Sequence, residues 1–467
     1  MLVRSHKIHS LLKAMGFWTW GLIAIAISAS LVSISFRTIS TTRDAASDNT
    51  VTGDANHAGT FADLMPAVRG ARGTAASGSN QPVISKVIGK DVSAAQKAMQ
   101  AGQWSEALEN LEAAETKGPL TTYDRKTIAE FTGIAYVRLN DFKSAQKAYE
   151  TALATGAYRA EELVRIFRLL FQLAAFNKDA KAIEYGVQAA AAGAATENDL
   201  LIMSQLYYQQ KDCTNSGIWG DKAIAAFKNA GGAPKEVLYQ LKLQCASNVN
   251  DIAAMRAALY DLIRLTNKTS YWNNLARLER QEERDDRNAL MIYRVMFDTN
   301  SMNADTDYIE MAQLLGDAGL PGEAQAVLEK AMSSGVLKDE HRDRTARLLN
   351  TMKTRADADR EELPALDAEA GKNAAGQLDV KLGEVYFGAG DYRDAASAIG
   401  RAIVKGQIRQ PEDAFVYLGR AQFALKHNAE ARKAFERLKS VPNMSTGVLR
   451  LWSLYSDMIP AEVSQPL

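Results

Sequence analysis

Few residues of this 467-residue sequence have the types and spacing that chemistry requires. Five histidines are present, and three of them precede the periodic part of the chain at positions 6, 9 and 57. The other two, His341 and His427, have no partner in an HxxxH or HExxH pattern. Zinc-binding helices carry two histidines at that spacing, so the sequence predicts no zinc site.

Other patterns of catalytic and ligand-binding sites are incomplete. The His-Arg-Asp triplet at 341–343 lacks the later Asn and the Asp-Phe-Gly motif of a kinase. The Gly-Ala-Gly triplet at 388–390 lacks the third glycine of a dinucleotide-binding loop, and no phosphate-binding or nucleophile-elbow motif occurs. The acids at 357–362 have Glu362 where a calcium loop needs glycine. We therefore expect no catalytic residue, no metal and no cofactor, and interpret the chain as a non-enzyme.

The charge balance excludes another class of function. Lys plus Arg and Asp plus Glu both number 55, so the net charge is zero. A nucleic-acid-binding protein normally shows an excess of basic residues, and we expect no nucleic-acid partner. Hydrophobic residues make up 47% of the chain, which is typical of a folded protein.

A repeated spacing of small and aromatic residues indicates paired helices. In residues 376–411 these positions recur mostly at intervals of three and four, namely Gly383, Tyr386, Gly390, Tyr392, Ala395, Ile399 and Ala402. That interval places residues on one helical face, and Gly390 with Asp391 separates two such helices. A hairpin of this kind cannot bury its apolar face alone, so the pattern predicts a stack of hairpins.

This register resembles the tetratricopeptide repeat, a helix-turn-helix unit of 34 residues. Clear units begin near residues 88, 126, 163, 197, 305, 376 and 412. The resemblance implies an all-α solenoid of about nine to ten repeats over residues 87–458, followed by a tail at 459–467. The register is not readable over 233–304 and 338–374. The second stretch has room for two helices, and Pro364 marks a break or the first turn of one of them.

The N-terminal segment favours export. Residues 1–16 are basic, and residues 17–36 form an apolar run that would span about 30 Å as a helix. We expect a single transmembrane anchor in the inner membrane, with the C-terminal domain in the periplasm. A cleaved signal peptide, which would leave a soluble periplasmic protein, is the alternative. Residues 37–86 are rich in Ser, Thr, Gly, Ala and Asp and are interpreted as a flexible linker.

The two cysteines, Cys213 and Cys245, lie 32 residues apart, which is close to one repeat. In the repeat register both fall on the same edge of the stack, so a disulfide is plausible in an oxidising compartment. The alternative is two small buried residues in separate cores.

The resemblance also implies a partner-binding groove lined by the first helix of each unit. Carried over by position, the candidate protein-binding residues are Phe167, Phe171, Gln205, Tyr208, Val380, Glu384 and Phe387. The aromatic members favour a helix or an extended peptide as the occupant. Packing of these aromatics against the preceding repeat is the alternative.

Several stretches are similar to exported tetratricopeptide proteins that accompany TonB-type energy-transduction systems. They are Ala98–Ala114, 133–136, 234–236, Tyr271-Trp272, 319–322 and Asp379–Gly400. The resemblance implies a scaffold in the bacterial envelope that contacts a TonB-type transducer complex. An adaptor in envelope assembly or polysaccharide export is the alternative within this class. An enzyme with scattered catalytic residues and a purely architectural spacer are the alternatives from other classes.

Overall fold

A computed structural model of the protein describes residues 83–461. The predicted anchor at 17–36, nearly all of the linker and most of the tail at 459–467 lie outside these residues. Among the described helices, none combines the length and the apolar character that crossing a membrane requires.

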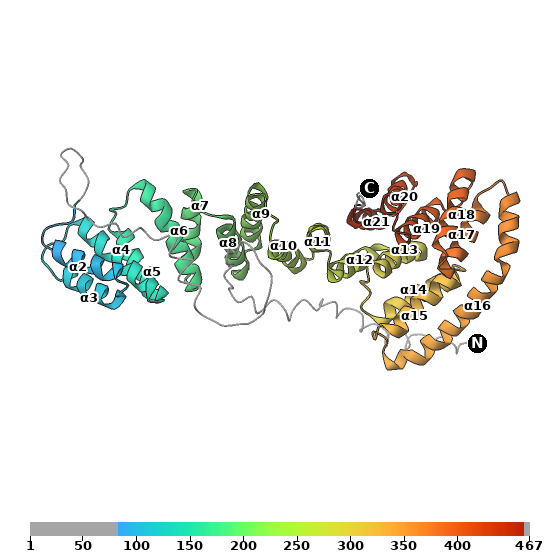
Figure 1. Cartoon of the computed structure of the whole chain (residues 1–467), viewed down its shortest axis with the longest axis horizontal. Coiled ribbons are helices and arrows are strands. Elements are labelled where there is room, and N and C mark those ends of the chain that lie inside the picture. Colours follow the sequence, from blue (N-terminus) through green and yellow to red (C-terminus); the bar gives the residue numbers. More distant parts are fainter. Residues whose placement is uncertain (1–82, 462–467) are drawn as a thin grey trace, which may run out of the picture. The chain divides into compact units, whose positions relative to one another are not determined.

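The described residues form twenty α-helices and one short 3-10 helix, without a β-strand (Figure 1). The chain divides into two compact units, unit 1 up to Asp199 and unit 2 from Leu200. The helices of unit 1 are α2 (Gly89–Gln100), α3 (Trp104–Glu115), α4 (Thr122–Arg138), α5 (Phe142–Ala154), α6 (Ala160–Phe176) and α7 (Ala182–Ala191). Helix α8 (Glu197–Gln209) begins in unit 1 and continues into unit 2.

Unit 2 contains the remaining helices. They are α9 (Cys213–Asn229), α10 (Glu236–Asn248), α11 (Ile252–Thr266), α12 (Thr269–Glu282), α13 (Asp286–Asp298), α14 (Asp305–Asp317), α15 (Pro321–Ser333), α16 (Asp339–Lys372), α17 (Gln377–Ala389), α18 (Tyr392–Lys405), α19 (Pro411–Ala424), α20 (Asn428–Glu436), η1 (Arg437–Ser440) and α21 (Thr446–Met458). Nine hairpins, from α2/α3 to α14/α15 and then α17/α18 and α19/α20, account for all helices except α16, η1 and α21. The expected all-α fold of repeated hairpins is confirmed for the described part of the chain.

The turns between paired helices use the same local chemistry repeatedly. Asn140 and Asn250 have positive φ angles and end the first helix of a hairpin. The next residue is an aspartate that caps the second helix: Asp141 accepts a hydrogen bond from the Ser144 amide, and Asp251 from the Ala254 amide. Asparagine tolerates the left-handed conformation and aspartate satisfies a free helix amide, so this pair fixes the hairpin turn.

Small residues let the two helices of a hairpin approach closely, as the sequence pattern predicts. Gly133 of α4 lies under the Tyr149 ring of α5, and a Cβ atom at Gly133 would come within 2.6 Å of that ring. The same relation joins Gly419 of α19 to Phe435 of α20. In unit 2 two glycines also meet across different hairpins, since a Cβ atom at Gly388 of α17 would lie 2.9 Å from the Gly322 Cα atom of α15.

Residues 338–374 differ from the expectation of two helices. They form one 34-residue helix, α16, that continues through Pro364. The buried residues Thr345, Met352, Ala356 and Ala370 follow one stripe along its length. Because α16 packs on both α15 and α17, tertiary contacts hold the helix together where proline alone would favour a break.

Unit 2 closes on itself at its C-terminal end. Helix α21 packs against α12 and α13, far earlier in the sequence (Figure 1). The Arg450 guanidinium lies 3.2 Å from the buried carboxylate of Glu279, and the ring of Tyr455 packs edge-on against Trp272. The apolar face of this last helix is therefore used for intramolecular packing.

A disulfide joins Cys213 at the start of α9 to Cys245 in α10, with Cα atoms 5.6 Å apart. The bridge links two successive hairpins of unit 2 across 32 residues of sequence. Such a link restricts the unfolded chain more than the folded one.

Replacement of Gly388 by alanine should destabilise unit 2 by about 1–3 kcal/mol, because the new methyl group meets backbone that cannot rotate away. Gly400 is the matched control, since it lies within α18 and a Cβ atom there would meet nothing within 4 Å. Gly400→Ala should stabilise by about 0.5–1 kcal/mol, as expected for alanine in a helix. Urea unfolding of both variants measures the difference, and an equal effect of the two substitutions would contradict the backbone contact.

Loss of the disulfide should lower the free energy of unfolding by about 3–4 kcal/mol, the chain-entropy value for a loop of this length. The double variant Cys213→Ser/Cys245→Ser tests this by urea unfolding. Reduced wild-type protein should match the variant, and addition of a reductant to the variant should change nothing. If the reductant leaves wild-type stability unaltered, the bridge contributes no stability.

Candidate functional site

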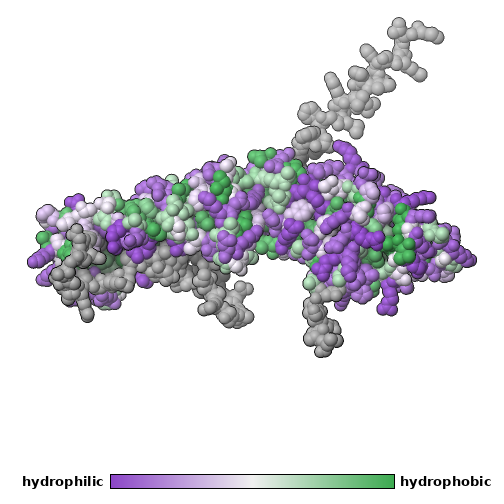
Figure 2. All heavy atoms as spheres, turned by 90° about the horizontal axis from the view of Figure 1, so that it is seen from above, coloured by the Kyte–Doolittle hydropathy of each residue, from purple (hydrophilic) through white to green (hydrophobic). Residues whose placement is uncertain are grey.

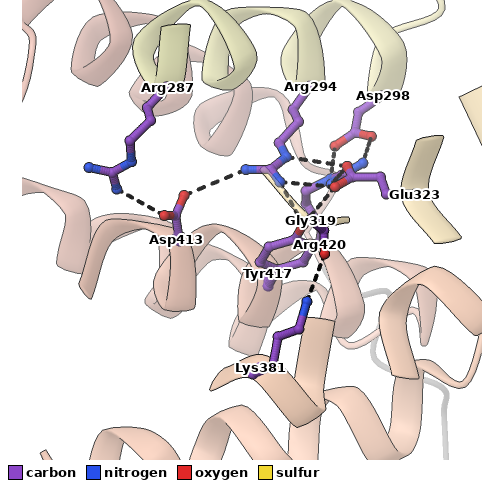
Figure 3. Close-up of polar contacts among 9 residues, drawn as sticks. All are labelled: Arg287, Arg294, Asp298, Gly319, Glu323, Lys381, Asp413, Tyr417 and Arg420. Carbon is purple, nitrogen blue, oxygen red and sulfur yellow. Dashed lines mark hydrogen bonds and ion pairs between the residues drawn. The ribbon is translucent and has the colours of Figure 1, made fainter. Parts of the chain in front are cut away.

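The largest concentration of buried charge in unit 2 lies where α13, α15 and α19 face one another (Figure 3). Glu323 of α15 is its centre, and it is 5% exposed. Arg294 of α13 donates two hydrogen bonds to Glu323, at 3.2 and 2.9 Å. Arg420 of α19 donates a further one to the same carboxylate, and the Tyr417 hydroxyl donates another at 2.6 Å.

The contacts extend from Glu323 to a second group of partners. Arg420 pairs with Asp298 through two hydrogen bonds of 2.9 and 3.0 Å. Arg287 binds Glu412 at 2.8 Å and Asp413 at 2.9 Å. We call the set Arg287, Arg294, Asp298, Glu323, Glu412, Asp413, Tyr417 and Arg420 the Glu323 network. Most of its contacts join residues between 94 and 126 positions apart in the sequence.

The electrostatics of the network follow from burial and pairing. Burial of Glu323 opposes its ionisation, but Arg294 and Arg420 outweigh burial and hold the pKa of the carboxyl at about 2. For Asp298 burial dominates and raises the pKa, although Arg420 opposes the shift. Glu323 is therefore an anion at neutral pH, and two arginines compensate its charge.

This arrangement is structural in character. The charged groups bind one another, and the Arg294 guanidinium also lies 4.6 Å from the Tyr417 ring centre. Within residues 83–461, no group of three or more His, Cys, Asp or Glu side chains is placed to hold a metal ion. The network joins hairpins that are distant in sequence, and that is the role its geometry supports.

The candidate groove residues of α17 face this network. Val380 is 3% exposed and packs with Ala414 and Tyr417. One turn further, Glu384 is half-buried, and after another turn the Phe387 ring lies 5.1 Å from the Tyr417 ring. These three positions share a helical face that is turned toward α19, so they line the interior of unit 2.

The other candidate groove residues differ in their exposure. Phe171 is fully buried, and Phe167 is half-buried beside it on α6. Gln205 and Tyr208 of α8 are half-buried. Phe167, Gln205 and Tyr208 are thus partly exposed to solvent, whereas Phe171 is not. The prediction that these residues bind a partner stays a prediction.

Unit 1 carries a polar surface that the sequence reading did not single out as a whole. Its half-buried members are Glu130 on α4, Arg165, Arg168 and Gln172 on α6, and Asn198 on α8, and we call it the polar strip. Arg168 and Gln172 both donate hydrogen bonds to the Asp199 carboxylate, at 2.7 and 3.0 Å respectively. These bonds connect α6 to the start of α8.

Several atoms of the polar strip are unsatisfied. Arg165 Nε, Gln172 Oε1 and Asn198 Oδ1 are buried and find no hydrogen-bond partner in the described part of the chain. Burial raises the pKa of Glu130, with Lys126 and Arg165 opposing the shift. Lys126 itself is paired with Glu162 at 3.0 Å, so it does not neutralise Glu130 through a direct ion pair.

Apolar residues are spread over the face of the described residues that Figure 2 shows. On the face of the molecule in Figure 2, hydrophobic residues appear in several separate groups among hydrophilic ones. Isolated apolar side chains of this kind are normal on protein surfaces.

Comparison with protein families gives a match in unit 2. Residues 380–445 match the tetratricopeptide repeat. The matched residues run from α17 to the turn before α21, so they include α19 and its contributions to the Glu323 network. No match was found among curated proteins, and nothing in the comparisons supports the TonB-associated subtype.

Solved structures show weak likeness to the chain. The Naa15/Naa10 complex bound to HypK-THB has a TM-score of 0.35 at 15% identity, covering 77% of this chain. The chain spans 59% of that protein's length. A tetratricopeptide repeat protein from Parabacteroides merdae has a TM-score of 0.24 at 12% identity, covering 79% of this chain and 99% of its own. The Cut9-Hcn1 hetero-tetramer of APC/C has a TM-score of 0.20 at 14% identity, with 79% and 77% covered.

Removal of Arg294 should strongly destabilise unit 2. Arg294→Met leaves Glu323 with one cationic partner in a buried site, which should cost about 3–5 kcal/mol. Arg264→Met is the matched control, because Arg264 and Asp457 form an exposed pair at 3.2 Å. That substitution should change the free energy of unfolding by less than about 1 kcal/mol. Urea unfolding compares the two, and similar small losses in both would contradict the assigned role of the network.

Proposed function

We propose that this protein is a non-enzymatic scaffold that binds another protein along the polar strip of unit 1. The observation that carries the proposal is the set of unsatisfied atoms at Arg165, Gln172 and Asn198. Helical-repeat folds commonly present extended surfaces to protein partners, and the repeats at 380–445 support this general role.

The chemistry of the unsatisfied atoms favours a polypeptide partner. Arg165 Nε is a donor, while Gln172 Oε1 and Asn198 Oδ1 are acceptors. Each buried polar atom without a partner costs about 1–3 kcal/mol, so a ligand that satisfies them gains affinity. A peptide main chain offers both donors and acceptors at short intervals. The side chains are half-buried while these three atoms are buried, so binding requires a change of rotamer that brings the atoms to the surface.

The interior of unit 2 contrasts with this surface. Arg294, Glu323 and Arg420 bind one another there, and α17 and α19 pack together through Val380 and Phe387. A partner would have to break these contacts before it could enter. The polar strip is therefore the better candidate for binding in the closed structure.

We further propose that the scaffold works in the periplasm, held at the inner membrane by residues 17–36. The disulfide between Cys213 and Cys245 supports an oxidising compartment, since such bridges are rare in the cytosol. A cleaved, soluble periplasmic form is the alternative. The first partner to test is a TonB-type transducer complex, and an envelope-assembly or polysaccharide-export complex is the second.

The test is affinity purification of the full chain from membranes, with partners quantified by mass spectrometry. Arg165→Glu reverses a charge in the polar strip and should reduce recovery of at least one partner by about tenfold, which corresponds to about 1.4 kcal/mol.

Arg344→Glu is the matched control, because Arg344 is exposed on α16 and forms no ion pair within residues 83–461. It should leave recovery unchanged. Equal recovery of every partner with both variants would reject the polar strip as the binding surface.

A further inference from the structure

One carboxylate of unit 2 faces the Glu323 network without belonging to it. Glu384 lies on α17 between Val380 and Phe387, at spacings of four and three residues. Val380 packs against Ala414 and Tyr417 of α19, and Phe387 lies 4.7 Å from the Arg420 guanidinium. Because these residues share one helical face, Glu384 also faces α19 and the network.

Glu384 forms no hydrogen bond or ion pair with any described residue. It lines a small recess together with Gly319, Gly322, Asp359, Arg360 and Lys381. The nearest cation along its own helix, Lys381, donates instead to the Gly319 carbonyl at 2.7 Å. Arg360 of α16 is paired with Asp357 at 2.6 Å. Both positive groups in the recess are thus engaged elsewhere.

A count of charges shows what ionisation of Glu384 does. The cations of the network and the recess are Arg287, Arg294, Arg420, Lys381 and Arg360, and the anions are Asp298, Glu323, Glu412, Asp413, Asp359 and Asp357, the partner of Arg360. The five positive charges already fall one short of the six negative charges while Glu384 is neutral. Ionised Glu384 adds one uncompensated negative charge beside Glu323 and Asp413, and such a charge is repelled by both.

We propose that Glu384 makes the contact between α17 and α19 a pH-dependent latch, which is closed when Glu384 is protonated and loosened when Glu384 is ionised. The groups that face Glu384 are Arg294 of α13, Glu323 of α15, Asp359 and Arg360 of α16, Lys381 of α17, and Asp413 and Tyr417 of α19. Opening moves Glu384 into water, where a carboxylate is well solvated. The latch does not depend on the partner-binding role of unit 1.

The pH range follows from the pKa of Glu384 in the two states. Burial raises the pKa to about 7, with Lys381 opposing and Asp413 adding to the shift. In the open state the carboxyl returns to its ordinary value near 4.5. The closed form binds the proton more tightly, so closure is most favoured at low pH and weakens as the pH rises toward 7. At pH values above 7 the weakening of closure is complete.

Hydrogen exchange of the full chain tests the latch. After correction for the intrinsic exchange rate, protection factors of α17 and α19 amides should fall about tenfold or more between about pH 5 and pH 8. Glu384→Gln removes the titrating group and should keep these amides protected at both pH values.

Two variants control for other titrating groups. Asp359→Asn changes another carboxylate of the recess, and His427→Asn changes the histidine in the turn after α19. Both should keep the pH dependence of the wild type. Constant protection in the wild type, or a fall in Glu384→Gln as large as that in the wild type, would overturn the proposal.

Discussion

The buried carboxylate of Glu323, bound by two arginines, is the interaction on which the form of unit 2 depends. Arg294 reaches it from α13 and Arg420 from α19, so helices separated by more than a hundred residues meet at one group. A buried charge is stable only when partners replace its lost hydration. This requirement holds the hairpins of unit 2 in one arrangement, because moving α19 away would leave Glu323 partly uncompensated.

Local interactions explain the helices themselves, and these could be read from the sequence. Glycine beneath an aromatic ring, as at Gly133 and Tyr149, sets the distance between paired helices. The asparagine and aspartate at 140 and 141 end one helix and begin the next. Both signals involve residues close in sequence, so spacing alone was sufficient to predict a stack of helical hairpins. At α16 the prediction of two helices was wrong, because packing on α15 and α17 overrides the local preference of Pro364.

The Glu323 network could not be predicted in the same way. Arg294 stands in an apolar run, Leu290 to Met296, where its charge is the one anomaly. That anomaly indicates a buried partner but does not identify it, since Glu323, Asp413 and Tyr417 lie in later hairpins. Repeat positions alone suggested a groove at Val380, Glu384 and Phe387. Closure of α19 onto α13 turns that face inward, and a position-by-position reading of single repeats does not contain this information.

The two units therefore offer different surfaces to solvent and to partners. In the Glu323 network of unit 2 the charged side chains bind one another, whereas the polar strip of unit 1 retains unsatisfied donors and acceptors. A double-mutant cycle with Glu323→Leu and Arg420→Met, measured by urea unfolding, tests the central claim most directly. The account predicts that the double variant loses about 2 kcal/mol less free energy of unfolding than the two single variants lose together. The reason is that the second substitution removes the charge that the first left unpaired. Additive losses, within about 0.5 kcal/mol, would show that the two residues are not coupled and would contradict the account.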